Sequence, residues 1–265
     1  MGRFEYLNKK IGESEMFKMK LRVCGEGFIT DLNSNVFYGA FAWAAVIVGG
    51  AASDIAYKAL HETTFSCALT DDLEVMKLDV FEVNKATIGR SADRNNEVST
   101  IKYWSTPLKS INGKSNGYRR EREDITVLCE TSIDEKEFKS LVEFMLVNGL
   151  GKRRTHGFGQ FKLVEINTIE IEADKIAESS KVKILGNLIP DDMASISGDY
   201  KVQSIQGRCN DGSTREKIVV VMPGSVLNMS GQKLNNDGTI GKLLECKNDS
   251  GETYYINGKV IVKPA

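Results

Sequence analysis

The amino-acid sequence predicts an α+β protein, with a βαββαβ element order in its first half and a mostly β second half. Residues 17–23 alternate strictly between apolar and basic side chains, which is typical of a strand with one buried face. Residues 37–48 are apolar nearly all round, as expected for a deeply packed helix. From residue 168 onward, short β-rich segments alternate with turns that contain glycine, asparagine or aspartate.

The first half continues with helical segments and several strands. Ser34 or Asn35 is the expected cap of the first helix. A second helical piece is expected at 54–61, directly after Ser53. Short runs rich in apolar and β-branched residues predict the following strands: 64–69, 75–80, 97–104 and 125–130.

A further helix and a closing strand complete this half. Ser132 and Glu135 have the spacing of a capping box, and the residues after them follow the period of an amphipathic helix. Gly149 is expected to end that helix, and 160–166 has the pattern of a closing strand. The resulting order is that of a ferredoxin-like (RRM-type) unit, interrupted by an insertion between its third strand and its second helix.

We therefore divide the chain into a ferredoxin-like domain at 1–167, with an insertion at about 84–124, and a mostly β half at 168–265. No helix comparable to those of the first half is expected in the second half. A degenerate second ferredoxin-like unit is one interpretation of it. Strands are expected there at four places: 181–188, 200–205, 217–222 and 253–262.

The composition is that of an ordinary globular protein. The formal net charge of −1, from 35 basic and 36 acidic residues, excludes a uniformly basic nucleic-acid coat but leaves room for local basic patches. The five cysteines lie far apart without zinc-ligand spacing, so no metal site is expected. The odd cysteine count and the absence of a secretory leader indicate a cytoplasmic protein. The most apolar stretch, 36–52, is too short to span a bilayer, so no membrane association is expected.

The most informative segment is 149–161, GLGKRRTHGFGQF, in which glycines surround Lys152, Arg153, Arg154 and His156. Glycines let successive backbone N–H groups form an anion-binding concavity, and arginines add forked donors for phosphate oxygens. These features predict a site for a polyanion backbone. The segment matches neither a P-loop nor a dinucleotide-binding fingerprint, because it follows a helix and precedes a strand. A glycine turn with solvated charges is the alternative.

This segment resembles the C-terminal glycine-rich signature of the RAMP superfamily (repeat-associated mysterious proteins), roughly GxGxxRxxGxGxF. The stretch at 34–50 is similar to the first helix of a RAMP family, the Csm-complex subunit four of type III-A CRISPR effector complexes. In that family a Ser-Asp-Thr-Leu-Phe-Gly-Ala-type motif starts the helix, and here it reads SNVFYGA. The stretches 223–229 and 254–264 resemble the family's C-terminal part. The residues that match the glycine-rich signature are Gly149, Gly151, Arg154, Gly157, Gly159 and Phe161.

The resemblance implies a RAMP fold and a non-catalytic, RNA-binding subunit that caps the 5′ handle of CRISPR guide RNA in a type III effector complex, as part of antiviral defence. It implies a large polymerase-like effector subunit and a RAMP backbone subunit as neighbours, and it requires no cofactor. It does not separate subtype III-A from III-B. The residues expected to hold handle phosphates, with their backbone N–H groups, are Gly149, Gly151, Lys152, Arg153, Arg154, His156, Gly157 and Gly159.

The predicted insertion is strongly basic. Between residues 84 and 122, nine lysines and arginines stand against three acidic residues, a local net charge of +6. Tyr103, Trp104 and Tyr118 lie among these cations, and aromatic faces stack on unpaired bases. The resemblance implies a β-hairpin thumb at 85–104 that lies across guide RNA, and a solvated surface hairpin is the alternative. The expected thumb contacts are Lys85, Arg90, Arg94, Lys102 and Trp104.

Two other functions are weighed against this one. Backbone subunits that cut target RNA carry an aspartate before an arginine in this region, and the comparable triplet here, 88–90, is Ile-Gly-Arg. A guide-RNA-processing endoribonuclease, another RAMP family, could use His156 as a general base with Lys152 or Tyr118 as its partner. The usual histidine of that family lies near the first helix, where this chain offers only His61. A protein-only scaffold subunit would show no salt-dependent affinity for RNA.

Overall fold

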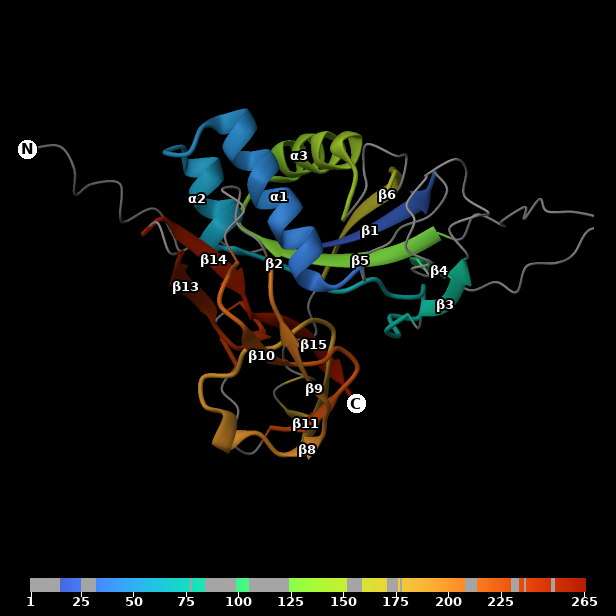
Figure 1. The fold of residues 1–265 in the computed structure, drawn as a ribbon, viewed down its shortest axis with the longest axis vertical. Coiled ribbons are helices and arrows are strands. Elements are labelled where there is room, and N and C mark those ends of the chain that lie inside the picture. Colours follow the sequence, from blue (N-terminus) through green and yellow to red (C-terminus); the bar gives the residue numbers. More distant parts are fainter. Residues whose placement is uncertain are drawn as a thin grey trace, which may run out of the picture.

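The computed structural model describes residues 15–24, 32–76, 78–83, 99–104, 124–151, 159–170, 176, 178–207, 214–229, 234–235, 237–248 and 251–265. In this part of the chain, helices α1, α2 and α3 cover one face of an antiparallel sheet, and the mostly β second half lies on the other side of the sheet (Figure 1). The predicted α+β class is therefore confirmed. None of the described helices is long and apolar enough to cross a membrane.

The first half contains two interlocked split βαβ units. Its main sheet has the strand order β2-β5-β1-β6, and every neighbouring pair is antiparallel. Strand β5 lies between β1 and β2, while β1 lies between β5 and β6, as the predicted ferredoxin-like unit requires. The elements are β1 (Glu15–Val23), α1 (Ser34–Gly49), α2 (Asp54–His61), β2 (Thr63–Phe65), β3 (Leu78–Val83), β4 (Ser99–Trp104), β5 (Asp124–Thr131), α3 (Glu135–Asn148) and β6 (Phe161–Ile169).

The insertion lies one element earlier than the sequence predicts. Strands β3 and β4 pair only with each other in the described structure, from Leu78 opposite Trp104 to Val83 opposite Ser99. They form a hairpin, which we call the thumb hairpin, and it lies between β2 and β5 in the chain and starts at residue 78. The thumb role of 85–104 stays a prediction. The sequence at 75–80 alternates like a half-buried strand, so the prediction took it as the third strand of the main sheet. The insertion was therefore placed after this strand instead of before the true third strand. In fact β5 is the third strand and leads directly into α3.

Two predicted helix caps are wrong by one or two residues. Asn33 caps α1 in place of 34–35, and Asp134 caps α3 in place of the capping box at 132–135. Each side chain accepts backbone N–H groups of the first turn at 3.1 Å. The Ser34 hydroxyl oxygen is engaged elsewhere, because it accepts a backbone N–H of the second half at 2.9 Å. The predicted cap of α2, Ser53, is confirmed.

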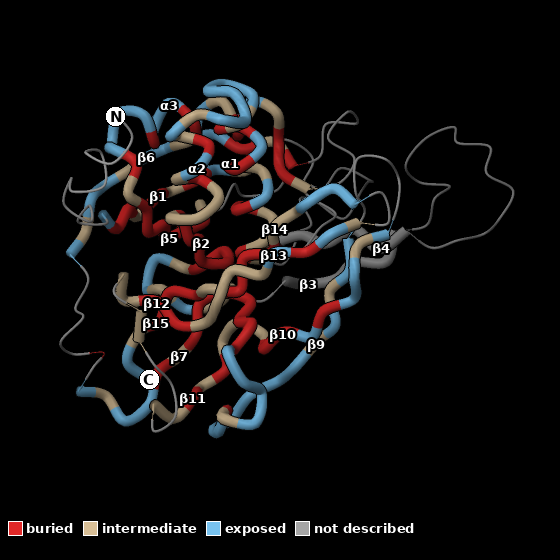
Figure 2. Tube along the Cα trace, turned by 90° about the vertical axis from the view of Figure 1, so that its left-hand side faces the viewer, coloured by how far each residue is buried: buried red, intermediate tan, exposed pale blue. Residues whose placement is uncertain are grey.

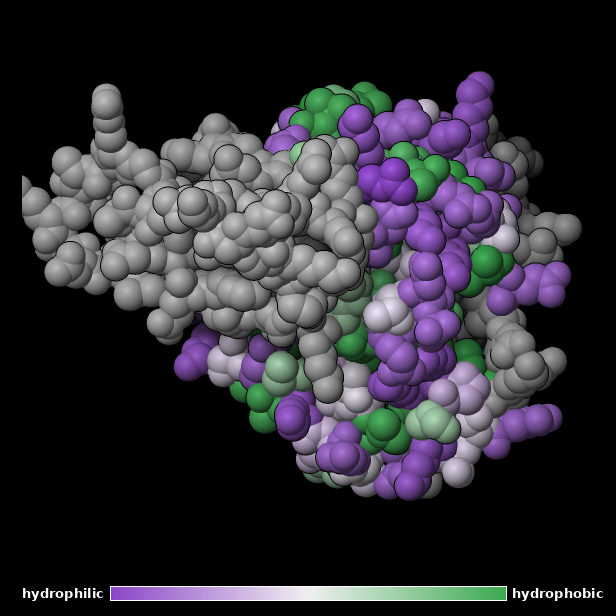
Figure 3. All heavy atoms as spheres, turned by 90° about the vertical axis from the view of Figure 1, so that its right-hand side faces the viewer, coloured by the Kyte–Doolittle hydropathy of each residue, from purple (hydrophilic) through white to green (hydrophobic). Residues whose placement is uncertain are grey.

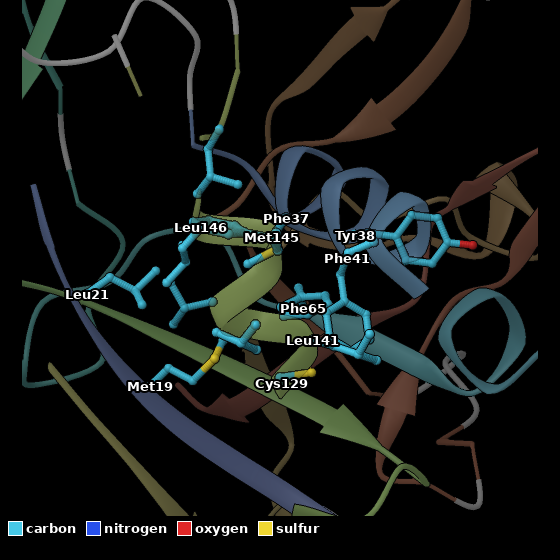
Figure 4. Packing of buried hydrophobic residues seen from close by; sticks show 14 of the residues in the cluster. Met19, Leu21, Phe37, Tyr38, Phe41, Phe65, Cys129, Leu141, Met145 and Leu146 are labelled. Atoms are coloured by element: carbon cyan, nitrogen blue, oxygen red, sulfur yellow. The ribbon is translucent and has the colours of Figure 1, made fainter. Parts of the chain in front are cut away.

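The core of this half lies between the sheet and the helices. The alternation of β1 places Phe17, Met19 and Leu21 on the helix side, where all three are fully buried. The ring of Phe138 in α3 stacks on Phe17 with 4.5 Å between centroids and lies 5.3 Å from Phe41 of α1. Figure 4 shows side chains of β1, α1 and α3 converging in this cluster. The aromatic contacts fix how the helices sit on the sheet.

The second half is mostly β, as predicted. A five-stranded antiparallel sheet has the order β12-β15-β7-β11-β8, and β9–β10 and β13–β14 form separate pairs. The predicted strand at 253–262 is two strands, separated at 258–259. The interpretation as a degenerate second ferredoxin-like unit stays a prediction, as does the domain division. The strands are β7 (Lys181–Ile184), β8 (Gly198–Asp199), β9 (Val202–Ile205), β10 (Ile218–Val221), β11 (Val226–Asn228), β12 (Thr239–Ile240), β13 (Leu243–Lys247), β14 (Thr253–Asn257) and β15 (Val260–Pro264).

The two halves share a packed junction, and Figure 2 shows buried residues on both sides of it. Met16 and Leu128, on the helix-free side of the sheet, pack in one cluster with Leu185 and Ile261 of the second half. The buried Asn257 side chain donates to a backbone oxygen of β2 at 2.8 Å. Apolar burial and paired polar groups together hold the halves in contact.

An ion-pair clamp at this junction predicts acid sensitivity. The Glu74 carboxylate forms ion pairs with Lys183 and with Lys263, whose Nζ lies 2.6 Å from Glu74 Oε1. These partners lower the pKa of Glu74 from 4.5 to about 2. Because the pKa is lower in the folded state, the clamp stabilises the protein above pH 4.5. That contribution is lost as the pH falls from 4.5 toward 2. We expect Glu74→Gln to lower the melting temperature at pH 7.

The test is thermal unfolding of the wild type and Glu74→Gln across that pH range. The difference in melting temperature should shrink steadily as the pH falls below 4.5. Glu143→Gln, at an exposed position on α3, is the control and should follow the wild type throughout. If the difference in melting temperature between the wild type and Glu74→Gln were equal at pH 7 and at the lowest pH, the stabilising role of the ion pairs would be contradicted. Only the ionised carboxylate can pair with the lysines.

Candidate nucleic-acid interface

The glycine-rich segment has a closed base in the structure. Helix α3 ends at Gly149 with φ 75°, and Leu150 is fully buried in the core. Gly151 and Gly159 also have positive φ, at 81° and 70°. The two ends of the segment meet at Leu150 and Gly159, where the Gly159 carbonyl oxygen accepts the Leu150 N–H at 2.8 Å. Gly149, Gly151 and Gly159 thus lie at the two ends of the segment, and their role in RNA binding stays a prediction.

The base leaves no room for a side chain at Gly159. A Cβ atom there would lie 1.9 Å from the Leu150 carbonyl oxygen, well inside van der Waals contact. The next residue ties the base to the sheet, because the Gln160 carbonyl oxygen accepts the N–H of Cys24 at 2.9 Å. Phe161 then enters the core at the start of β6. The segment is thus anchored at the end of β1.

The other predicted site residues are not brought together by the described structure. Lys102 and Trp104 lie on β4, opposite Val80 and Leu78 in the thumb hairpin. The remaining ones lie outside the described residues, and their roles stay predictions: Lys152, Arg153, Arg154, His156 and Gly157 in the glycine-rich segment, and Lys85, Arg90 and Arg94 in the insertion.

A row of cations lies beside this base. The alternation of β1 places Lys18, Lys20 and Arg22 on the face of the sheet opposite the helices. Lys162 of β6 pairs opposite Arg22, so it lies on the same face. We call these four residues the β1 strip. Figure 3 shows the side of the molecule at which β1 ends, where hydrophilic residues form a band between apolar patches.

Carboxylates from distant parts of the chain hold two of these cations. Lys20 pairs with Asp71 at 3.0 Å, and Asp71 also accepts the Thr126 hydroxyl. Arg22 makes a forked pair with Asp124 at 2.6 and 2.8 Å. The hydrogen bonds from Lys20 and Arg22 lower the pKa of Asp71 and of Asp124, so both carboxylates are ionised at neutral pH. Sequence reasoning found the basic face of β1 but missed these partners, which lie 51 and 102 residues away.

A β-bulge lies next to the strip. Lys20 pairs with Glu165 and Leu21 with Leu163, which leaves Val164 without a partner position on β1. The Val164 side chain is 44% exposed. Bulges re-aim side chains and recur next to functional sites. The sheet thus presents an apolar side chain to solvent beside a row of cations.

His61 lies away from the glycine base: its ring packs against Tyr57 at 4.5 Å and edge-on to Tyr255 at 5.0 Å. Among the described residues, no cluster of histidine, cysteine or carboxylate side chains could hold a metal ion. These residues offer backbone N–H groups at a glycine turn and the four cations of the β1 strip on one face of the sheet.

No family model matches the chain, and no curated protein matches it either. Its structure is similar to that of a chain in the Csm3–Csm4 subcomplex of the type III-A CRISPR-Cas interference complex. That similarity has a TM-score of 0.55 at 13% identity and covers 95% of this chain and 99% of the other. The chain shares the fold of a type III-A CRISPR-Cas subunit. The fold class that the sequence predicts is thereby confirmed.

Two further similarities are weaker. A RAMP protein that binds different RNA substrates matches with a TM-score of 0.46 at 11% identity, over 92% of this chain and all of the other. A chain of the Csm1–Csm4 cassette in complex with cA3 matches with a TM-score of 0.44 at 14% identity, over 94% of this chain and 99% of the other.

Proposed function

We propose that this protein is a non-catalytic subunit of a type III CRISPR effector complex that binds guide RNA and caps its 5′ handle. Its role is then in antiviral defence. The cations of 152–154 and His156 hold handle phosphates together with the backbone N–H groups of the glycine-rich segment. The thumb hairpin, with Lys102 and Trp104 on β4, contacts the RNA beyond the handle.

The observation that carries the proposal is the closed glycine base between α3 and β6. Three glycines with positive φ and one short hydrogen bond between Leu150 and Gly159 anchor both ends of a segment that contains three adjacent cations. A base that is already formed lowers the entropic cost of binding a polyanion there. The β1 strip beside it holds four cations, of which Lys20 and Arg22 are paired with carboxylates. A nearly full-length fold match to a CRISPR-Cas subunit supports the same assignment.

The proposed partners follow from two sources. The similar chain of known structure belongs to a Csm3–Csm4 subcomplex, which supports a RAMP backbone subunit as one neighbour. The polymerase-like neighbour rests on the sequence resemblance, and the cytoplasmic location rests on the cysteine pattern. Recognition of the handle needs no cofactor, because phosphates are held by cations and backbone donors alone.

The experiment is a gel-shift assay with labelled guide RNA that carries its 5′ handle, in EDTA and across a salt series. Wild type is compared with Arg153→Ala/Arg154→Ala, with His156→Ala, and with a control, Lys136→Ala/Lys139→Ala on the exposed face of α3. The arginine double variant should bind much more weakly and lose about 1.4 from the slope of log affinity against log salt. The control should bind as the wild type does.

The RNA should stay intact in every lane. Equal binding by the arginine variant and the control would remove the glycine-rich segment from the interface. Cleavage by the wild type that His156→Ala abolishes would instead identify a processing endoribonuclease, because cleavage in EDTA needs a general base and no metal. If the wild type shows no salt-dependent affinity for RNA, the result would point to a protein-only scaffold.

A further inference from the structure

The β1 strip continues the predicted phosphate site along the sheet. Cys24, just after the end of β1, bonds to Gln160 beside the glycine base, and Arg22 lies two residues before Cys24. From there Lys20 and Lys18 follow along the strand, at intervals of about 6.6 Å for every second residue. A strand of cations that leads directly away from an anion-binding turn suits an extended polyanion more than a single phosphate.

Two cations of the strip are already neutralised within the protein. Asp71 pairs with Lys20 and Asp124 with Arg22, but the two pairs differ in exposure: the Asp71 side chain is 65% exposed, whereas the Asp124 side chain is only 18% exposed and holds Arg22 through two hydrogen bonds. A single exposed ion pair contributes little net free energy, because water and salt compete for both partners. An arriving phosphate therefore displaces Asp71 from Lys20 at little net cost, while the Arg22–Asp124 pair stays in place.

We propose that the β1 strip binds the phosphodiester backbone of the RNA adjoining the handle, with a phosphate displacing Asp71 from Lys20. The inference rests on the proposed function, since it places the strip next to RNA held by the glycine-rich segment. Val164, which is exposed at the bulge on the neighbouring strand, lies close to this strip. Asp71 then sets how tightly the strip binds any polyanion.

This exchange has a distinctive salt signature. An ordinary phosphate contact releases the counterion that was condensed on the RNA, which steepens the salt dependence of binding. A phosphate that displaces Asp71 leaves a free carboxylate, which attracts a cation from solution in turn. The contact through Lys20 therefore adds almost nothing to the salt dependence in the wild type. Without the Asp71 charge, the phosphate contact through Lys20 should contribute to the salt dependence as any other phosphate contact does.

The test compares two matched variants in RNA binding across a salt series. Asp71→Asn and Asp54→Asn each remove one exposed carboxylate from a lysine pair, at 3.0 and 2.9 Å respectively, and the Asp54 pair lies on α2 in the helix layer. The asparagine oxygen still accepts the Thr126 hydroxyl, so Asp71→Asn should fold. We expect it to bind guide RNA about two- to fivefold tighter at low salt. Its salt slope should be steeper by about 0.7.

Asp54→Asn should match the wild type in slope. Identical slopes for Asp71→Asn and Asp54→Asn would overturn the exchange, since both variants change net charge equally. This outcome is distinguishable from failure of the proposed function: in that case the arginine double variant of the glycine-rich segment would bind RNA like the wild type.

Discussion

Replacing Phe138 with alanine is expected to destabilise the protein by about 3–5 kcal/mol, the usual cost of emptying a buried phenylalanine site. The Phe138 ring is fully buried and stacks on Phe17 while touching Phe41, so its loss separates α3 from both the sheet and α1. Neighbouring side chains cannot fill the space without moving a helix. The measurement is equilibrium unfolding in urea, followed by far-UV circular dichroism.

The control for this prediction lies on the same helix. Val147 is 78% exposed, and Val147→Ala should change the free energy of unfolding by less than about 0.5 kcal/mol. A loss below about 1 kcal/mol for Phe138→Ala would contradict the packing described here, because it would mean that the ring is not enclosed.

The second large effect is expected at Gly159. An alanine there would hold a left-handed backbone, which costs about 1–3 kcal/mol, and its Cβ would meet the Leu150 carbonyl oxygen at 1.9 Å. The base must open to relieve that contact, so the Leu150–Gly159 hydrogen bond is lost. We expect Gly159→Ala to lower the melting temperature and to weaken guide-RNA binding under conditions where the variant is folded.

Gly39 provides the matched control. It lies in α1, and a Cβ atom there would meet nothing within 4 Å. Gly39→Ala should therefore leave RNA binding unchanged and stabilise the helix by up to about 1 kcal/mol. Normal RNA binding by a folded Gly159→Ala protein would contradict the role given to the closed base.

Local patterns in the sequence predicted the first half well. The alternation along β1 and the helical period after Ser132 depend only on neighbouring residues, and both elements are present with nearly the expected bounds. The position of the insertion was wrong because it depends on which strands pair. Strand β5 joins β1 and β2 through contacts between residues far apart in sequence, and no local pattern records them.

In the candidate site, too, the local features were predictable and the long-range contacts were not. Its glycines were predictable because a cluster of glycines and cations is a local signal, and the structure gives Gly149, Gly151 and Gly159 positive φ. The carboxylates of the β1 strip were not predictable. Asp71 lies in a turn and Asp124 at the start of β5, and only the folded sheet brings them to Lys20 and Arg22.

The most direct test of the central claim is a nuclease footprint of the wild-type protein on end-labelled guide RNA with its 5′ handle, in EDTA. The account predicts protection of the handle and of the nucleotides next to it, with the rest of the RNA open to the nuclease. Protection spread evenly along the RNA, or protection confined to the 3′ end, would contradict the assignment of this chain as the cap of the 5′ handle.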